Sequence, residues 1–173
     1  WSSDVCSSDL MCVVMGIGMA GVGLSVMHDA NHGSYSGNRK LNQFMSYSMN
    51  VVGGHYMNWQ IQHNTLHHTF TNIEGHDEDI APVGFLRFSP HAPYRKIHRY
   101  QFIYAWFFYG LMTLMWVATK DFNQLKRYNQ GGLLKTARTT YAKQLVILIT
   151  SKVLYYALMI VLPLLVMHIT WWQ

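Results

Sequence analysis

The stretch that decides the fold is residues 10–27, LMCVVMGIGMAGVGLSVM, which contains no charged side chain. A single α-helix needs about this many apolar residues to cross a hydrocarbon core of roughly 30 Å. The glycines of this stretch would weaken a soluble helix, whereas small residues allow membrane helices to approach one another closely. The sequence therefore predicts a membrane-spanning helix, and the histidine-containing segment HDANH follows it directly at residues 28–32.

Two further apolar stretches lie downstream. Residues 153–172, VLYYALMIVLPLLVMHITWW, predict a second span with Lys152 at its basic entrance. Residues 100–117, YQFIYAWFFYGLMTLMWV, are also apolar, but basic residues lie on both sides of them. One crossing would place a basic loop outside, against the positive-inside tendency. Their aromatic content favours a helix that lies in, or dips into, the cytoplasmic leaflet, with an ordinary span as the alternative.

The composition supports the same class of protein. Half of the residues are apolar and only 12% are charged, against about 25% in soluble domains. This composition excludes a disordered chain, a coiled coil and a nucleic-acid-binding module, so no nucleic-acid partner is expected. The net charge of +5 beside so much apolar sequence favours a cytoplasmic membrane face. We therefore expect an all-α, multi-pass integral membrane protein.

Both ends of the chain are unusual. Residues 1–9, WSSDVCSSD, form a polar string that adjoins an apolar run, and we interpret them as a non-native leader. The chain stops at WWQ, residues 171–173, beside a hydrophobic stretch. Since aromatic residues mark membrane interfaces with more chain beyond them, the expected domain, residues 10–173, is incomplete at both ends.

The first histidine cluster lies at the end of the first span. On an α-helix, His28 and His32 are separated by four residues and share one face, about 6 Å apart. This spacing suits a metal ion or a pair of ions.

The second cluster is HNTLHH at residues 63–68. Residues 56–69 follow the Gly53–Gly54 break and are expected to be helical. His63 and His67 then share a face, while His68 points roughly 100° around the helix and could reach a second ion.

A histidine pair on an apolar helix often belongs to the core, and this is the alternative to a metal site. Five histidines in two clusters near a membrane are different, because ionisable groups at membrane depth are costly and rare unless functional. Structural zinc sites favour cysteine ligands, and Cys6 and Cys12 form no such site. A set of many imidazoles suits iron and oxygen chemistry better.

The segments HDANHGSYS, WQIQHNTLHHTFTNIEGHDEDI and RYQFIYAWFFYGLMTLMW resemble the membrane fatty acid desaturases, especially acyl-CoA and acyl-lipid enzymes of the linoleoyl-CoA or front-end type. The resemblance covers residues 10–173. It implies O2-dependent desaturation of an acyl-CoA or acyl-lipid at a di-iron centre. It also implies an electron donor that is a small haem protein or a ferredoxin, and histidine boxes on the cytoplasmic side.

The resemblance also implies the iron ligands, which are His28, His32, His63, His67 and His68. Family members carry a third box, QxxHH or HxxHH, and this chain contains none. We therefore expect the chain alone to be inactive. The alternatives are a related membrane di-iron hydroxylase of the alkane, sterol or carotenoid type, and a non-catalytic histidine-lined membrane protein.

Other polar residues are weaker candidates. Asp29 and Asn31 could orient the box histidines, because metal-bound imidazoles usually donate their other N–H. Asp77 and Asp79 match the family's wording but could simply shape a turn. His76 is expected to be solvated, and no role in iron binding is assigned to His55, His91, His98 or His168.

Overall fold

The computed structural model describes residues 3–81 and 84–166. Every regular element in these residues is a helix, which confirms the all-α prediction. Three helical stretches are long and apolar enough to cross a membrane: Asp9–His32, Lys96–Gln130 and Tyr141–Val166. The chain is therefore an α-helical membrane protein.

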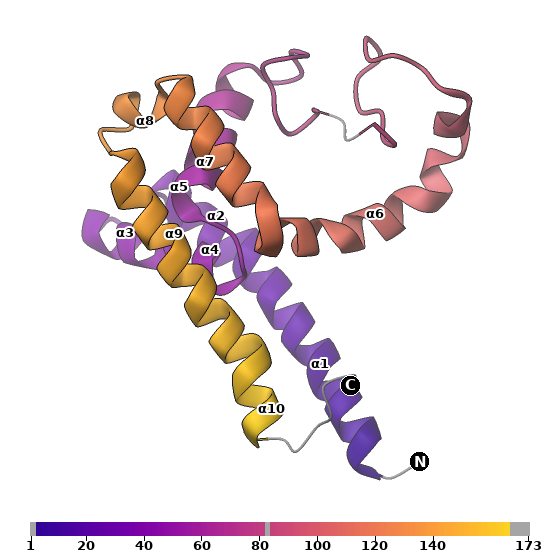
Figure 1. The fold of residues 1–173 in the computed structure, drawn as a ribbon, viewed down its shortest axis with the longest axis vertical. Helices are drawn as coiled ribbons and strands as arrows, with labels where there is room; N and C mark the ends of the chain where they lie inside the picture. The colour runs from indigo at the N-terminus through magenta and orange to yellow at the C-terminus, as the bar shows by residue number, and fades with distance from the viewer. Residues whose placement is uncertain (1–2, 82–83, 167–173) are drawn as a thin grey trace. The chain divides into compact units, whose positions relative to one another are not determined.

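The chain forms two compact units, Trp1–Val52 and Gly53–Gln173. The helices of the first unit are α1 (Ser3–Gly21), η1 (Val22–Met27), α2 (His28–His32), α3 (Arg39–Ser46) and α4 (Ser48–Val51). The first three form one continuous helical rod, of which η1 is a π-helical segment (Figure 1). This rod contains the predicted span at residues 10–27.

The rod ends at Gly33, whose φ of 76° lies in the left-handed region that favours glycine. The turn that follows is held by Asn42, whose amide donates to the carbonyl groups of Gly33 (2.7 Å) and Ser36 (2.8 Å). Asn38 caps α3, because its side chain accepts hydrogen bonds from the N–H groups of Lys40 and Leu41. The end of the first histidine helix is thus fixed by side-chain hydrogen bonds.

The second unit contains the remaining helices. They are α5 (Tyr56–Trp59), η2 (Gln60–His67), η3 (Lys96–Tyr100), α6 (Gln101–Met115), η4 (Trp116–Lys120), α7 (Asp121–Gln130), α8 (Leu133–Thr136), α9 (Tyr141–Tyr156), η5 (Ala157–Val161) and α10 (Leu162–Val166). Helix α7 packs against α9 (Figure 1). Helices α5 and η2, which carry the second histidine cluster and are called the box helix below, pack against both α7 and α9. The buried core consists of Ile61, Leu125, Tyr128, Leu134 and Leu148.

The apolar stretch at residues 100–117 forms α6 and continues into η4. The chain bends at η4, so that α6 and α7 form the two arms of a V (Figure 1). Such π-helical segments are a recognised cause of bends in long helices. The shape agrees with a segment that dips into one leaflet, although length and composition also allow a span. The membrane side of this segment stays a prediction.

The last span differs from its predicted bounds. The sequence predicts residues 153–172 with Lys152 at the entrance, whereas the helix begins at Tyr141 and is described up to Val166. His168 and the terminal tryptophans lie outside the described residues. The prediction for Lys152 is wrong, because this residue lies inside α9 and its side chain is only 6% exposed.

Lys152 is instead the centre of a buried polar contact. Its ammonium nitrogen lies 2.7 Å from a carboxylate oxygen of Asp121 and donates to the carbonyl groups of Gly53 (2.7 Å) and Trp116 (2.8 Å). The three donors of the ammonium group are therefore satisfied. These bonds connect α9 to the start of α7, to the bend at η4 and to the turn before the box helix.

The turn at Gly53 requires glycine for two reasons. Its φ is 93°, and a Cβ atom built there would lie 2.8 Å from a methyl group of Val117. Any larger residue would push the box helix away from the bend.

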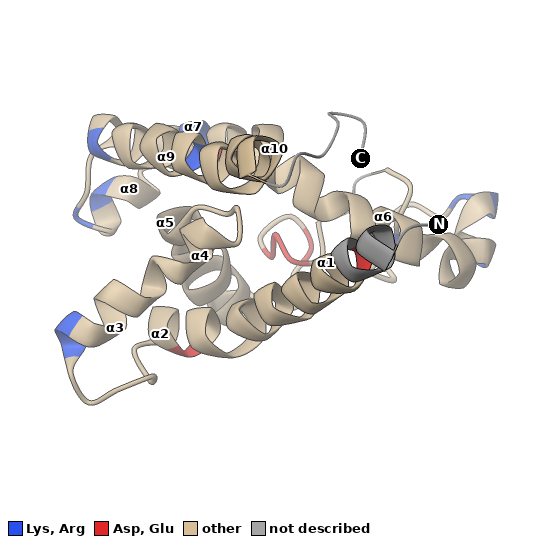
Figure 2. Cartoon of the chain, turned by 90° about the horizontal axis from the view of Figure 1, so that it is seen from below, with Lys and Arg blue, Asp and Glu red and all other residues tan. Residues whose placement is uncertain are grey.

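Exposed lysines gather at one end of the second unit. Figure 2 shows Lys and Arg on α8 and on the neighbouring parts of α7 and α9. The other end of the α9–η5–α10 rod is apolar and exposed. This polarity is typical of a helix whose basic end lies among headgroups and whose apolar end enters the bilayer.

Candidate metal centre

The first cluster lies on α2 in the first unit. The rings of His28 and His32 are edge to face with centroids 4.5 Å apart, as expected for a pair four residues apart on an α-helix. Asp29 lies beside His28, with 3.1 Å between a carboxylate oxygen and Nδ1. The amide of Asn31 instead donates to the Met27 carbonyl at 2.9 Å. Asp29 is thus placed to orient a box histidine, whereas the Asn31 amide group is used to hold the backbone.

The second cluster lies on η2 in the second unit. The predicted helix at residues 56–69 is present, but its central part is π-helical. The rings of His63 and His68 have centroids 4.8 Å apart, closer than the 5.3 Å between His63 and His67. A π-helix aligns residues i and i+5, whereas an α-helix aligns i and i+4. His68 therefore lies beside His63 and not roughly 100° around the helix from it, whereas its contact with a second ion stays a prediction.

An aromatic ring supports this cluster from the preceding turn. Trp59 stacks on His63 with ring centroids 4.4 Å apart. The indole therefore packs against a box histidine.

Asp77, a weaker candidate in the sequence, contacts a box histidine. Its side chain is fully buried, and its carboxylate lies 3.0 Å and 3.1 Å from Nδ1 of His67. It also accepts hydrogen bonds from the N–H groups of Asn72 and Asp79. A hydrogen bond from Nδ1–H to a carboxylate fixes the tautomer of an imidazole and directs its Nε2 atom to a metal.

Asp79 lies between two box histidines. One carboxylate oxygen is 3.4 Å from Nδ1 of His63 and 3.4 Å from Nδ1 of His67. The other oxygen accepts a hydrogen bond of 2.6 Å from the amide of Gln62. One donor atom from each of His63, His67 and Asp79 lies within 4.8 Å of the others, which is a spacing that suits a metal ion.

The protonation states of this loop suit metal binding. Burial lowers the pKa of His63 below its usual value, so the imidazole is neutral and can donate a lone pair. Burial raises the pKa of Asp77, but hydrogen bonds from Asn72, His67 and Asp79 outweigh it and bring the pKa below the usual range. A neutral imidazole and an ionised carboxylate are the forms that a metal site needs. The residues present therefore fit a cation such as iron.

Histidines outside the clusters have different surroundings. His76 is exposed, as predicted, and packs on Phe70 with ring centroids 5.1 Å apart. His98 accepts a hydrogen bond from the Arg95 N–H. His55 is fully buried. Within the described part of the chain, none of these three belongs to a group of donors close enough to hold a metal.

The comparison with known families settles the family. The model of the fatty acid desaturase family matches residues 8–173. The chain belongs to the fatty acid desaturases.

Curated members of the desaturase family are similar to the chain over different lengths. It is 40% identical to the sn-1 linoleoyl-lipid 6-desaturase of Arthrospira platensis over 107 residues, which are 62% of this chain and 29% of that protein. It is 36% identical to the acyl-lipid (8-3)-desaturase of Physcomitrium patens over 167 residues, which are 94% of this chain and 34% of that protein. The chain spans about a third of the length of these relatives. No solved structure matches it.

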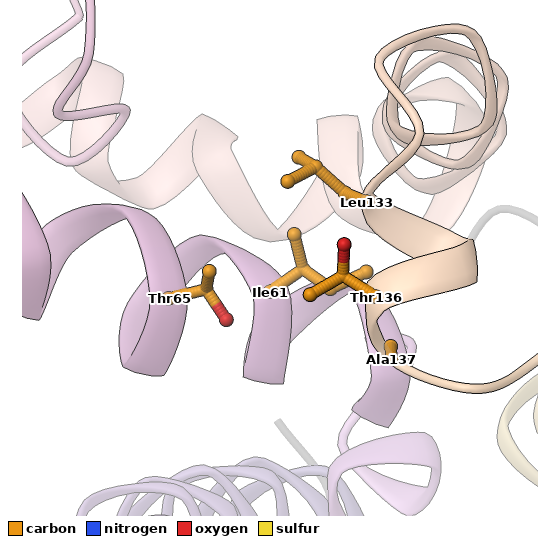
Figure 3. A pocket seen from close by; sticks show the side chains of 5 residues that line it. All are labelled: Ile61, Thr65, Leu133, Thr136 and Ala137. Carbon is orange, nitrogen blue, oxygen red and sulfur yellow. The ribbon is translucent and has the colours of Figure 1, made fainter.

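This desaturase-family chain also has a small cavity beside the box helix. Its volume is about 100 Å³, and Figure 3 shows Ile61 and Thr65 of η2 opposite Leu133, Thr136 and Ala137 of the α8 region. Sites for ligands of drug size usually have volumes of roughly 300–1,000 Å³. This cavity alone is too small for a long acyl chain, but a more open hollow of about 330 Å³ shares its residues Ile61, Thr65 and Ala137.

Proposed function

We propose that the protein carrying this chain introduces a carbon–carbon double bond into the acyl chain of a membrane lipid. The observation that carries the proposal is the second histidine cluster, in which the carboxylates of buried Asp77 and of Asp79 lie beside the Nδ1 atoms of imidazoles on η2. Family membership supports the same conclusion.

The chemistry explains why such a cluster is needed. Two adjacent methylene groups each lose a hydrogen atom, O2 is reduced to two water molecules, and an external donor supplies two electrons together with two protons. These methylenes are not acidic and have no leaving group, so side-chain acids and bases cannot activate them. Iron held by the histidines would activate O2 for this oxidation. The protein must hold the imidazoles in place, orient the methylenes and exclude water.

We assign the iron ligands to five histidines, namely His28, His32, His63, His67 and His68, with about two iron ions per chain. His67 is the best supported, because Asp77 holds its Nδ1–H and Nε2 is then the coordinating atom. The assignment of His28 and His32 rests on their common face on α2 and on the family resemblance.

The substrate we propose is an acyl-lipid. The similar curated proteins are named as acyl-lipid or linoleoyl-lipid desaturases. A substrate that resides in the bilayer agrees with helices whose large apolar side chains are exposed. The electron donor we propose is a small haem protein or a ferredoxin that meets the histidine boxes on the cytoplasmic side.

The test is expression of the complete reading frame in a host that makes linoleoyl lipids but no further unsaturated products. Gas chromatography with mass spectrometry should detect a new polyunsaturated acyl chain, and the purified protein should contain about two irons. His67→Ala and His68→Ala should abolish the product and lose at least one iron. His76→Gln, a substitution at an exposed histidine, is the matched control and should change neither. A hydroxylated product would assign the protein to the hydroxylases, and full activity without iron would contradict the metal assignment.

A further inference from the structure

Three consecutive acids follow the second histidine cluster, and the middle one faces a different helix from its neighbours. Asp77 and Asp79 face the box histidines, whereas Glu78 faces α7. Arg127 donates two hydrogen bonds to one oxygen of Glu78, from Nη2 at 2.7 Å and from Nε at 3.1 Å. The other oxygen accepts from the Tyr128 hydroxyl at 2.6 Å and from the Gln124 amide at 3.2 Å. Both oxygens of Glu78 are therefore held.

These bonds are part of a closed network. The Gln124 amide also donates to the side-chain oxygen of Gln62 at 2.5 Å, and the Gln62 amide donates to Asp79 at 2.6 Å. Gln62 directly precedes the box histidine His63. The network thus runs from α7 through Glu78 and Asp79 to the box helix and returns through Gln62 to α7.

The three adjacent carboxylates of residues 77–79 need hydrogen-bond donors to offset their mutual repulsion. Three adjacent carboxylates repel one another unless each has its own donors. Glu78 obtains them from a guanidinium group, which binds carboxylates strongly, and from a nearly buried phenol. Fixing Glu78 on α7 fixes the backbone of residues 77–79, and this backbone sets how far Asp77 and Asp79 lie from the imidazoles.

We propose that Glu78, held by Arg127, Tyr128 and Gln124, is a positioning residue for the metal ligands. It acts by keeping Asp77 on Nδ1 of His67 and Asp79 between His63 and His67. This inference rests on the proposed function, since it assumes that these histidines bind a metal. Helix α7, which carries no ligand of its own in the proposal, then controls the orientation of the histidine box.

The experiment measures metal binding by the purified protein from the complete reading frame. Metal-free protein is titrated anaerobically with Fe(II) and separately with Co(II), whose absorption spectrum reports ligand geometry. Glu78→Gln keeps the shape of the side chain and removes its charge. It should weaken metal affinity about tenfold and change the Co(II) spectrum, because substitutions around metal ligands typically cost 10–100-fold.

The matched control is Glu74→Gln. Glu74 lies in the same loop, is exposed, and accepts a bond of 3.3 Å from the Ser89 hydroxyl. This variant should retain the affinity and the spectrum of the unsubstituted protein. Tyr128→Phe removes the 2.6 Å hydrogen bond to Glu78 and the 3.2 Å hydrogen bond that the hydroxyl accepts from the Gln124 amide. It should shift the Co(II) spectrum in the same direction as Glu78→Gln. If Glu78→Gln does not fold, the Co(II) spectrum of Tyr128→Phe tests the positioning role of Glu78.

The outcomes separate this inference from the proposed function. If the unsubstituted protein binds no metal, the proposed function fails. If it binds iron and forms the unsaturated product while Glu78→Gln matches Glu74→Gln in affinity and spectrum, the positioning role is wrong and the proposed function stands. If Glu78→Gln fails to fold and Tyr128→Phe leaves the spectrum unchanged, the positioning role is also wrong.

Discussion

His55 shows how strongly single residues are constrained beside the histidine box. It is fully buried directly before α5. Burial, together with a smaller effect of the charge of nearby Lys152, lowers its pKa to about 4. A hydrogen bond from the Asn58 side chain partly offsets this lowering of the pKa. The charge of Lys152 is itself paired with Asp121. His55 is therefore neutral in the folded protein at neutral pH.

This neutrality predicts an acid-sensitive stability. Because the pKa of His55 is lower in the folded state than the usual 6.5, the unfolded state binds more protons between pH 6.5 and about 4. The contribution is fully present above pH 6.5 and is lost as the pH falls towards 4, by about 3 kcal/mol in total. The measurement is the unfolding temperature of the metal-free protein in detergent as a function of pH. In His55→Gln this temperature should fall less between pH 6.5 and 4 than in the unsubstituted protein. His76→Gln should leave the profile unchanged, and equal profiles for the two variants would contradict the buried, neutral state.

At the scale of the elements, Lys152 connects the last helix to the rest of the second unit. A buried ion pair that loses one partner leaves an uncompensated charge, which costs about 3–5 kcal/mol. Lys152→Met should therefore destabilise the protein strongly, since Asp121 is completely buried. Lys143→Met, at an exposed lysine of the same helix, should have little effect.

The double substitution Lys152→Met with Asp121→Asn tests the cause. It should recover part of the lost unfolding temperature, because the unpaired charge is gone. If the double variant is as unstable as the sum of the two single variants, the ion pair is not the source of the stability.

Local patterns predict the elements better than they predict the contacts between elements. The apolar run at residues 10–27 and the helix at residues 56–69 could be recognised from uninterrupted apolar sequence and from the glycine break. The π-helical geometry of η2 could not, because periodicity does not distinguish a local extra residue per turn. The pairing of Lys152 with Asp121 joins residues 31 positions apart, and only tertiary packing brings them together.

The candidate site also contains residues that local sequence predicts and residues that it does not. Histidine spacing and family wording indicate the box residues, whereas the contact of Asp77 with His67 depends on tertiary structure. Its role depends on a loop that folds back onto η2 by hydrogen bonds from Asn72 and Asp79. The acidic run at residues 77–79 and the family wording both point to Asp77, but neither distinguishes a solvated loop from one fixed against the box helix.

At the scale of the whole molecule, the remaining question is which membrane surface each part faces. The V formed by α6 and α7 and the bond between Glu78 and Arg127 bring the loop before α6 close to the helix after the bend. Both ends of the apolar stretch at residues 96–130 should then lie on the cytoplasmic side.

Cysteine labelling tests this topology. With Cys6 and Cys12 replaced by serine, single cysteines at Glu74 and Gln130, both exposed, should react with an impermeant maleimide from the same side of sealed vesicles. Labelling from opposite sides would mean that residues 96–130 cross the bilayer. A cysteine at exposed Val166 should be protected or labelled from the other side.

The π-helical turn at η2 has a consequence for how the histidine box tolerates change. In α-helical register the partner of His63 one turn later is His67, and in π-helical register it is His68. Two adjacent histidines therefore give His63 an imidazole neighbour in either register. Because His67 and His68 are adjacent, a one-residue insertion or deletion within this turn would change which imidazole lies beside His63. His63 would still have an imidazole neighbour.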